Sequence, residues 1–92
     1  MKEFKDLEFV NHDDNFTIGI RARMFFPNGY GISVIKNNRS YGGKDGLYEV
    51  GVLDSKGDLC YDTPVTDDVI GWLTERGVSV IMKRVQELPS AS

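Results

Sequence analysis

The sequence predicts an α+β domain: an antiparallel β-meander of four to five strands, with one face covered by C-terminal helix in two short segments. Apolar and polar residues alternate with a period of two from Thr17 to Phe26, which is typical of a half-buried strand. Between Val78 and Leu88, apolar residues recur at helical spacing with charged residues between them. Glycine-containing turns separate the apolar runs before that helix, as in a meander.

The first elements follow from alternation and turn chemistry. Loose alternation predicts a first strand from Phe4 to Val10, and the polar run from Asn11 to Asn15 predicts a turn. The strand from Thr17 to Phe26 has two distinct faces. Its apolar face consists of Ile18, Ile20, Ala22, Met24 and Phe26. Its other face presents Arg21, Arg23 and Phe25, with Thr17 and Gly19.

The turn Pro27-Asn28-Gly29 decides the register of the next hairpin. A two-residue loop would place Met24 opposite Ser33 and mix apolar with polar side chains. A three-residue loop places Met24 opposite Ile32 instead, with Gly29 in the left-handed position that glycine accepts most readily. Because a one-residue slip reverses both faces of a strand, we expect the three-residue loop.

The rest of the sheet is predicted in the same way. The expected elements are a third strand (Tyr30–Lys36), a ten-residue loop (Asn37–Gly46), a fourth strand (Leu47–Leu53) and a short fifth strand (Leu59–Tyr61). The turn Ser55-Lys56-Gly57 repeats the three-residue logic, so we expect Leu53 to pair with Leu59 and Val52 with Cys60.

Thr66 predicts the N-cap of a first helical segment, since Asp67 and Asp68 follow it in the first turn. Gly77 is expected to interrupt the helix, and a second segment follows it. The side chains expected to cover the sheet are Ile70, Leu73, Val78, Ile81, Met82, Val85 and Leu88. We expect Trp72 at the helix–sheet junction. One domain over residues 1–89 and a frayed tail over 90–92 complete the organisation.

Composition limits the possible partners and the expected cellular compartment. The formal net charge is -3, so the molecule as a whole does not offer the basic surface that sequence-independent binding to the nucleic-acid backbone requires. Cys60 is the only cysteine, which excludes an internal disulfide and a CxxC metal site and points to a reducing compartment. The N-terminal residues lack the apolar region of a signal peptide, and no apolar run reaches the length of a membrane span. We therefore expect a cytoplasmic protein without membrane contact.

No residue pattern predicts catalysis, a cofactor or a metal. His12 is the only histidine, and its turn with Asp13 and Asp14 matches no known calcium loop. Cys60 lies between Leu59 and Tyr61, where a small buried apolar strand residue is expected rather than a nucleophile paired with His12. Three acids surround the second turn, where aspartate is favoured for turn geometry alone: Asp54, Asp58 and Asp62. The glycine-rich run Ser40–Lys44 lacks the spacing and the following helix of a phosphate loop.

Charge is distributed unevenly along the chain. Between Ile20 and Lys44 there are five basic residues and no acid. The candidate binding residues are Arg21, Arg23 and Phe25 on the strand face, with Arg39, Tyr41 and Lys44 in the loop. This combination fits single-stranded nucleic acid, an acidic groove on a protein, or an ordinary solvated face, and the sequence leaves these alternatives open.

Three segments resemble a family of small, uncharacterised proteins of tailed bacteriophages and prophages. They are FFPNGYGISV (Phe25–Val34), SYGGKDGLYEVGVL (Ser40–Leu53) and YDTPVTDDVIGWLTE (Tyr61–Glu75), within a run from Gly19 to Leu73. The family's function is unknown, so the resemblance implies a bacterial host cell as the setting and no catalytic residue.

The expected function is that of a non-enzymatic phage accessory protein that binds a host protein, such as a component of a CRISPR or restriction defence system. Two other classes remain open. One is a nucleic-acid-binding module that uses the same basic strand face. The other is a structural or morphogenetic component that self-associates through an exposed strand edge.

Overall fold

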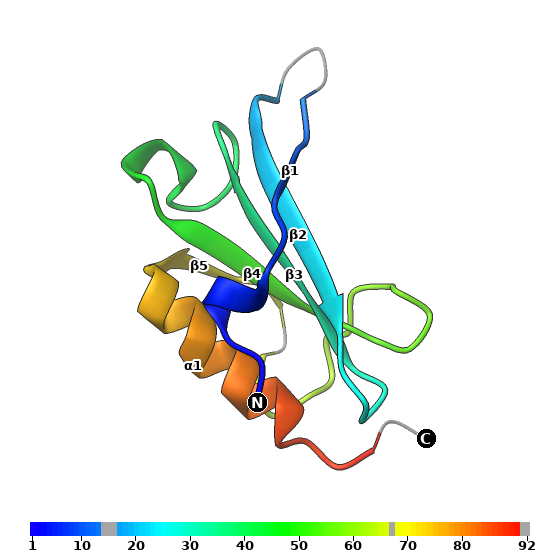
Figure 1. The fold of residues 1–92 in the computed structure, drawn as a ribbon. Helices are drawn as coiled ribbons and strands as arrows, with labels where there is room; N and C mark the ends of the chain where they lie inside the picture. Colours follow the sequence, from blue (N-terminus) through cyan, green and yellow to red (C-terminus); the bar gives the residue numbers. More distant parts are fainter. Residues whose placement is uncertain (14–16, 67, 91–92) are drawn as a thin grey trace.

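The computed structural model describes residues 1–13, 17–66 and 68–90. These residues form a five-stranded antiparallel sheet in the order β1-β2-β3-β4-β5, and one α-helix lies across one face of it (Figure 1). The elements in chain order are η1 (Phe4–Asp6), β1 (Val10–Asn11), β2 (Gly19–Phe25), β3 (Gly31–Asn37), η2 (Gly43–Asp45), β4 (Tyr48–Leu53), β5 (Ile70–Leu73) and α1 (Glu75–Gln86). The predicted α+β meander with a covering C-terminal helix is confirmed.

The β2–β3 hairpin has the predicted three-residue loop. Met24 lies opposite Ile32, and the N–H of Phe26 donates to the carbonyl of Tyr30 at 2.8 Å. Gly29 has a φ of 91°, the left-handed value that the bulge requires. Ala22 and Phe26 are buried in the core, and Ile20 and Met24 pack against it, which confirms the predicted apolar face of this strand. Ile18 is the exception, because it lies before the strand and is 70% exposed.

The predicted first strand over Phe4–Val10 is wrong for most of its length. Residues 4–6 form the single turn η1, and only Val10 and Asn11 pair with β2. The apolar residues before β1 instead cross the face of the sheet that α1 covers. There the ring of Phe4 lies 5.1 Å from that of Tyr48 and 5.5 Å from that of Phe9. Aromatic packing onto Tyr48 therefore outweighs pairing with β2. The second half of the predicted polar turn lies outside the described residues.

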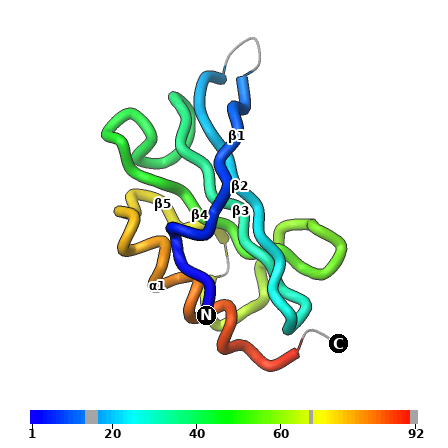
Figure 2. Tube along the Cα trace, in the orientation of Figure 1, coloured from blue at the N-terminus to red at the C-terminus, as the bar shows by residue number. Residues whose placement is uncertain are grey.

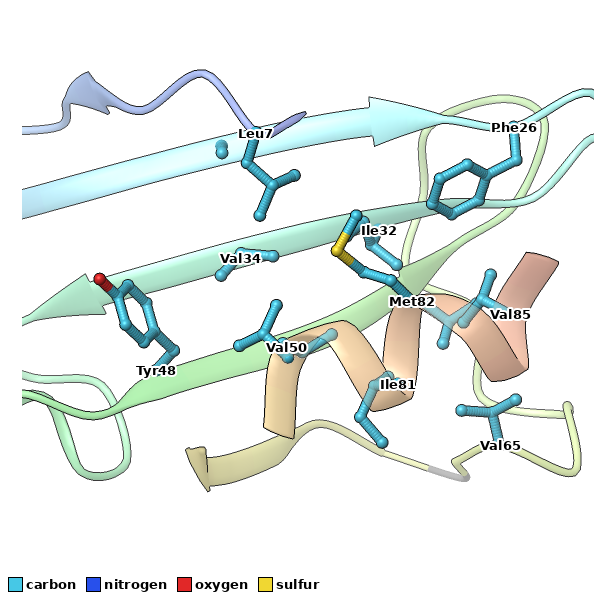
Figure 3. Packing of buried hydrophobic residues seen from close by; sticks show 13 residues of the cluster. Leu7, Phe26, Ile32, Val34, Tyr48, Val50, Val65, Ile81, Met82 and Val85 are labelled. Carbon is cyan, nitrogen blue, oxygen red and sulfur yellow. The ribbon is translucent and has the colours of Figure 1, made fainter. Parts of the chain in front are cut away.

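The predicted short fifth strand is present only as one bridge, Leu53 to Leu59, with the N–H of Cys60 donating to the carbonyl of Val52 at 2.8 Å. After this bridge the chain leaves this edge of β4, and it returns to the same edge as β5. Val65 in the excursion reaches the core beneath α1, as Figure 3 shows. One edge of β4 thus receives two separate pieces of chain.

The predicted first helical segment after Thr66 is also wrong. The Thr66 hydroxyl accepts from the N–H of Asp68 at 3.0 Å in a local turn, and Asp67 lies outside the described residues. Ile70 and Leu73 belong to β5, opposite Val50 and Tyr48, with a bulge between them. The extra bulge residue turns both apolar side chains to the helix side of the sheet.

The predicted second helical segment is confirmed as α1. The Thr74 hydroxyl accepts from the N–H of Gly77 at 3.1 Å, so Gly77 stands in the capped first turn and does not interrupt the helix. The buried face of the helix consists of Val78, Ile81, Met82 and Val85. Figure 3 shows one of them, Met82, extending from the helix toward the sheet.

The turn of the β2–β3 hairpin also holds the far end of α1. The side-chain amide of Asn28 donates to the carbonyls of Val85 at 2.9 Å and Leu88 at 3.1 Å. Its Oδ1 accepts from the N–H of Tyr30 at 3.2 Å. The last carbonyls of a helix have no partner within it, so Asn28 both shapes its own turn and caps the helix.

Candidate functional site

The face of the sheet opposite α1 is called here the open face. Its side chains follow from the strand register, because residues directly opposite one another point the same way. Three rows cross it from β2 through β3 to β4: Arg21, Ile35 and Glu49; Arg23, Ser33 and Gly51; Phe25, Gly31 and Leu53. The predicted face of Arg21, Arg23 and Phe25 is therefore the open face.

Small residues along the middle of the open face let two apolar side chains lie across it. A β-carbon at Gly31 would lie 2.7 Å from Cδ1 of Phe25, and one at Gly51 would lie 2.5 Å from Cδ2 of Leu59. Phe25 and Leu59 nevertheless remain 52% and 42% exposed. Leu53, which shares the row of Phe25 and pairs with Leu59, is buried, and the two exposed side chains leave an apolar surface beside the arginines.

The two arginines on the open face have no acidic partner in the part of the chain that the structure describes. Arg21 and Arg23 are both exposed. The one ion pair within residues 1–13, 17–66 and 68–90 joins Lys5 to Glu3 at 3.6 Å, far along the chain. Both guanidinium groups are therefore free to bind a carboxylate or a phosphate in a partner.

The open face is less basic than the charge distribution along the chain indicates. Glu8 lines a hollow of about 210 Å³ together with Val10, Arg21, Ala22 and Arg23. Glu49 shares a row with Arg21, two strand spacings or about 10 Å away. Both acids lie outside the acid-free stretch of sequence and reach the face only through folding. A face of mixed charge suits a protein partner better than a nucleic-acid backbone.

Tyr41 reaches the same face from the loop after β3. Its carbonyl accepts from the N–H of Trp72 at 3.2 Å, and its N–H donates to Oε1 of Glu49 at 3.4 Å. A β-carbon at Gly71 would lie 2.3 Å from Cβ of Tyr41, so the tyrosine lies directly over the glycine of β5. The loop residue Tyr41 thus joins the strand residues at the β5 side of the open face.

Trp72 is a candidate binding residue that sequence reasoning missed. We expected it at the helix–sheet junction, but its side chain is 60% exposed beside the equally exposed Tyr41. Its φ of 59° is unusual for a bulky residue and belongs to the β5 bulge, which turns it away from the core. No sequence signal marks this conformation, because it depends on the register of β5 against β4.

Arg39 and Lys44 are not brought to the arginines of the open face. Lys44 lines a hollow at the end of the sheet with Ile18, Ile20 and Lys36. Ile20 packs against the core, and Nζ of Lys36 lies 4.9 Å from the centre of the Tyr48 ring. Arg39 is exposed in the turn after β3, where its N–H donates to Oδ1 of Asn37 at 2.8 Å. The predicted set therefore divides between the open face and the loop.

The backbone N–H groups of the glycine-rich loop donate hydrogen bonds within the loop. The N–H of Ser40 donates to Oδ1 of Asn37 at 2.7 Å, and the N–H of Gly43 donates to the carbonyl of Ser40 at 3.0 Å. The N–H of Asp45 likewise donates to the carbonyl of Gly42 at 3.0 Å. A phosphate cradle needs such donors unpaired and pointing at one centre. These bonds therefore hold the shape of the loop.

Cys60 donates its thiol hydrogen to Oδ1 of Asp62 at 2.9 Å. This bond, together with desolvation, raises the pKa of the thiol, so its reactive thiolate form is suppressed. His12 adjoins Gly19 at one edge of β2, whereas Cys60 adjoins the far edge of β4. Four strand spacings, roughly 19 Å, separate them, which excludes a nucleophile–base pair.

Alkylation tests this environment. Replacing Asp62 with alanine is expected to lower the Cys60 thiol pKa toward its ordinary value and to speed the reaction with iodoacetamide at pH 8 severalfold. Mass spectrometry of quenched time points measures the rate. The matched control is Asp58→Ala, a neighbouring exposed acid whose side chain makes no hydrogen bond to the thiol. Equal rates in the two variants would contradict the assignment.

Two further features that bear on function are a membrane-spanning helix and a metal-binding cluster. In the described ranges, no helix combines the length and the apolar character needed to cross a membrane. The same ranges hold no cluster of three or more histidine, cysteine or acidic side chains placed to bind a metal.

No protein-family model, curated protein or solved structure matches the chain. The resemblance to small tailed-phage proteins therefore stays a prediction.

Proposed function

We propose that this chain is a non-enzymatic binding protein whose open face docks on another protein. The observation that carries the proposal is the exposure of Arg21, Arg23 and Phe25 side by side on a sheet, with no ion pair to either arginine among the described residues. Arginine and aromatic residues dominate the binding energy of protein interfaces. Exposed Tyr41 and Trp72 extend the same kind of surface to the β5 edge.

The support beneath these side chains suits an interface. Phe25 lies over Gly31, and β2, the strand that carries Phe25, pairs with β3 along its whole length. The position of Phe25 is therefore set by the sheet rather than by a mobile loop. Side chains that are already ordered lose little entropy when they bind. A complementary partner would present carboxylates to the two arginines and an apolar recess to Phe25.

The biological setting is part of the proposal. The resemblance to tailed-phage proteins supports a host protein as the partner, including a component of a restriction or CRISPR system. Binding of single-stranded nucleic acid through the same face is disfavoured by Glu8 and Glu49 and by the separate position of Lys44. The two classes differ in salt dependence, which is steep for phosphate contacts.

Charge reversal tests the proposal. Tagged protein is expected to retain one host protein from a nuclease-treated bacterial lysate, and the double variant Arg21→Glu/Arg23→Glu is expected to lose it, with an unchanged melting temperature. The control, Arg76→Glu/Lys83→Glu, makes the same charge change on the exposed side of α1 and is expected to retain the partner. Equal retention by both double variants would exclude the open face as the site. Loss of stability in the first variant would make its arginines structural.

A further inference from the structure

The edge of the sheet beside the two arginines is only half occupied. β1 pairs with β2 at two positions, Val10 with Arg21 and Asn11 with Ile20. The chain before β1 then turns from β2 toward α1, and Figures 1 and 2 show the two segments diverging along the lower part of β2. The half of β2 that leads to Phe25 thus has β3 on one side, and none of the described residues forms a strand on the other.

The hydrogen bonds around Gly19 show which backbone groups face that edge. Its carbonyl accepts from the N–H of His12 at 2.9 Å, and its N–H donates to Oδ1 of Asp13 at 3.0 Å. Alternate residues of a strand direct their N–H and C=O to the same side, so those of Arg23 and Phe25 also point out of this edge. No described residue supplies a partner to either pair of groups.

Charge is the one usual protection against strand pairing that this free edge has. Natural edges are protected by charged side chains, proline, a bulge or a covering segment. Between Arg21 and Phe25 there is no proline, and the pairing of β2 with β3 is regular. The hollow of about 210 Å³ lined by Glu8, Arg21 and Arg23 lies where β1 ends, so the line of β1 is open for continuation along β2.

We propose that an acidic, extended segment of the partner protein adds to the sheet as a strand along Arg23–Phe25, in line with β1. The inference rests on the proposed function and specifies how the partner is held. Two residues supply two donors and two acceptors for main-chain bonds, and a carboxylate beside Arg23 would form a cross-strand charge pair. Alternate side chains of the segment would lie on the open face next to Phe25.

Charge complementarity favours this occupant over a second copy of the chain. Antiparallel pairing of two β2 strands about Met24 would place Arg23 of one copy diagonal to Arg23 of the other, about 7–8 Å apart. Each copy would also contribute Arg21 to the same surface. Like charges at such positions oppose pairing, whereas a segment with glutamate or aspartate is attracted to them.

Amide exchange measured by NMR on the labelled full chain tests the edge directly. In the free protein, Arg23 and Phe25 N–H groups are expected to exchange fast, and Ala22 and Met24 N–H groups, which face β3, slowly. The probe is a millimolar hexapeptide of alternating glutamate and valine, and its lysine–valine counterpart is the control. The acidic peptide is expected to slow exchange at Arg23 and Phe25 by roughly tenfold, and the basic one to leave it unchanged.

The outcomes separate this inference from the function it rests on. Slow exchange at Arg23 and Phe25 in the free monomer, or no protection by the acidic peptide, overturns strand addition. Protection that rises with protein concentration alone identifies a second copy as the occupant and overturns it as well. If strand addition fails while Arg21→Glu/Arg23→Glu still loses the host protein, the open face binds through side chains only. If the charge reversal also has no effect, both proposals fail.

Discussion

Replacing Met82 with alanine is expected to lower the free energy of unfolding by about 2–5 kcal/mol, the cost typical of a large-to-small change in a core. Met82 is fully buried, and Figure 3 shows its side chain extending from α1 toward Ile32 of the central strand β3. Truncation would leave a cavity between the helix and the sheet that neither rigid element can close. For a domain of this size, each kcal/mol lowers the melting temperature by roughly 4–8 °C. Urea unfolding followed by circular dichroism measures the change.

Lys83 provides the matched control, since it follows Met82 in the same helix but is exposed. Its replacement by alanine is expected to change stability by less than about 0.5 kcal/mol. If Met82→Ala were as mild as Lys83→Ala, the helix would not be packed on the sheet as the structure has it. A drop in the slope of the urea transition would instead indicate that the variant no longer unfolds in one step.

The β2–β3 hairpin shows where sequence patterns suffice. Alternation assigned Ala22 and Met24 to one face, and only one loop length set them opposite apolar residues of the next strand. Pattern and turn chemistry agree there, with Gly29 supplying the left-handed residue. The open face of Arg21, Arg23 and Phe25 followed from the same alternation. Local information was enough because both strands and their turn are adjacent in the chain.

Two segments were mispredicted because their apolar spacing fits more than one structure. Ile70 and Leu73 are three residues apart, as on one face of a helix. The bulge at Gly71 and Trp72 gives the same result in a strand, and its existence depends on β4, some twenty residues earlier. Likewise Phe4, Leu7 and Phe9 belong to the core, but through η1 and Tyr48 rather than through a strand. In both segments, the structure depends on contacts with residues that are distant in the sequence.

The same limit applies to the candidate site. The sequence placed two arginines and a phenylalanine together, but the acids Glu8 and Glu49 come from strands and segments outside that stretch. Tyr41 joins the face because its loop rests on Gly71, and Trp72 is exposed because β5 bulges. Charge counted along the chain therefore overestimated how basic the face is.

Replacing Asn28 with aspartate is expected to cost about 3 kcal/mol at neutral pH, although the two side chains have nearly the same shape. The amide of Asn28 donates to the carbonyls of Val85 and Leu88 at the end of α1. A carboxylate there would offer only acceptors, against carbonyl oxygens at the negative end of the helix dipole. Since aspartate also suits the turn, the loss would arise from these contacts alone. Thermal and urea unfolding measure it.

Two further variants and a pH series isolate the cause. Asn28→Ala removes the donor without adding charge and is expected to cost less, about 1–2 kcal/mol. Asn11→Asp adds the same charge at an exposed site of β1 and is expected to be near neutral. In Asn28→Asp the carbonyls disfavour the charged form, so the folded-state pKa of the new carboxyl lies above its unfolded value of about 3.9. The destabilisation is then largest above the folded-state pKa and shrinks as pH falls toward 4, where a protonated carboxyl again donates to the helix. A deficit that stays constant over this range would contradict a carboxylate facing the end of α1.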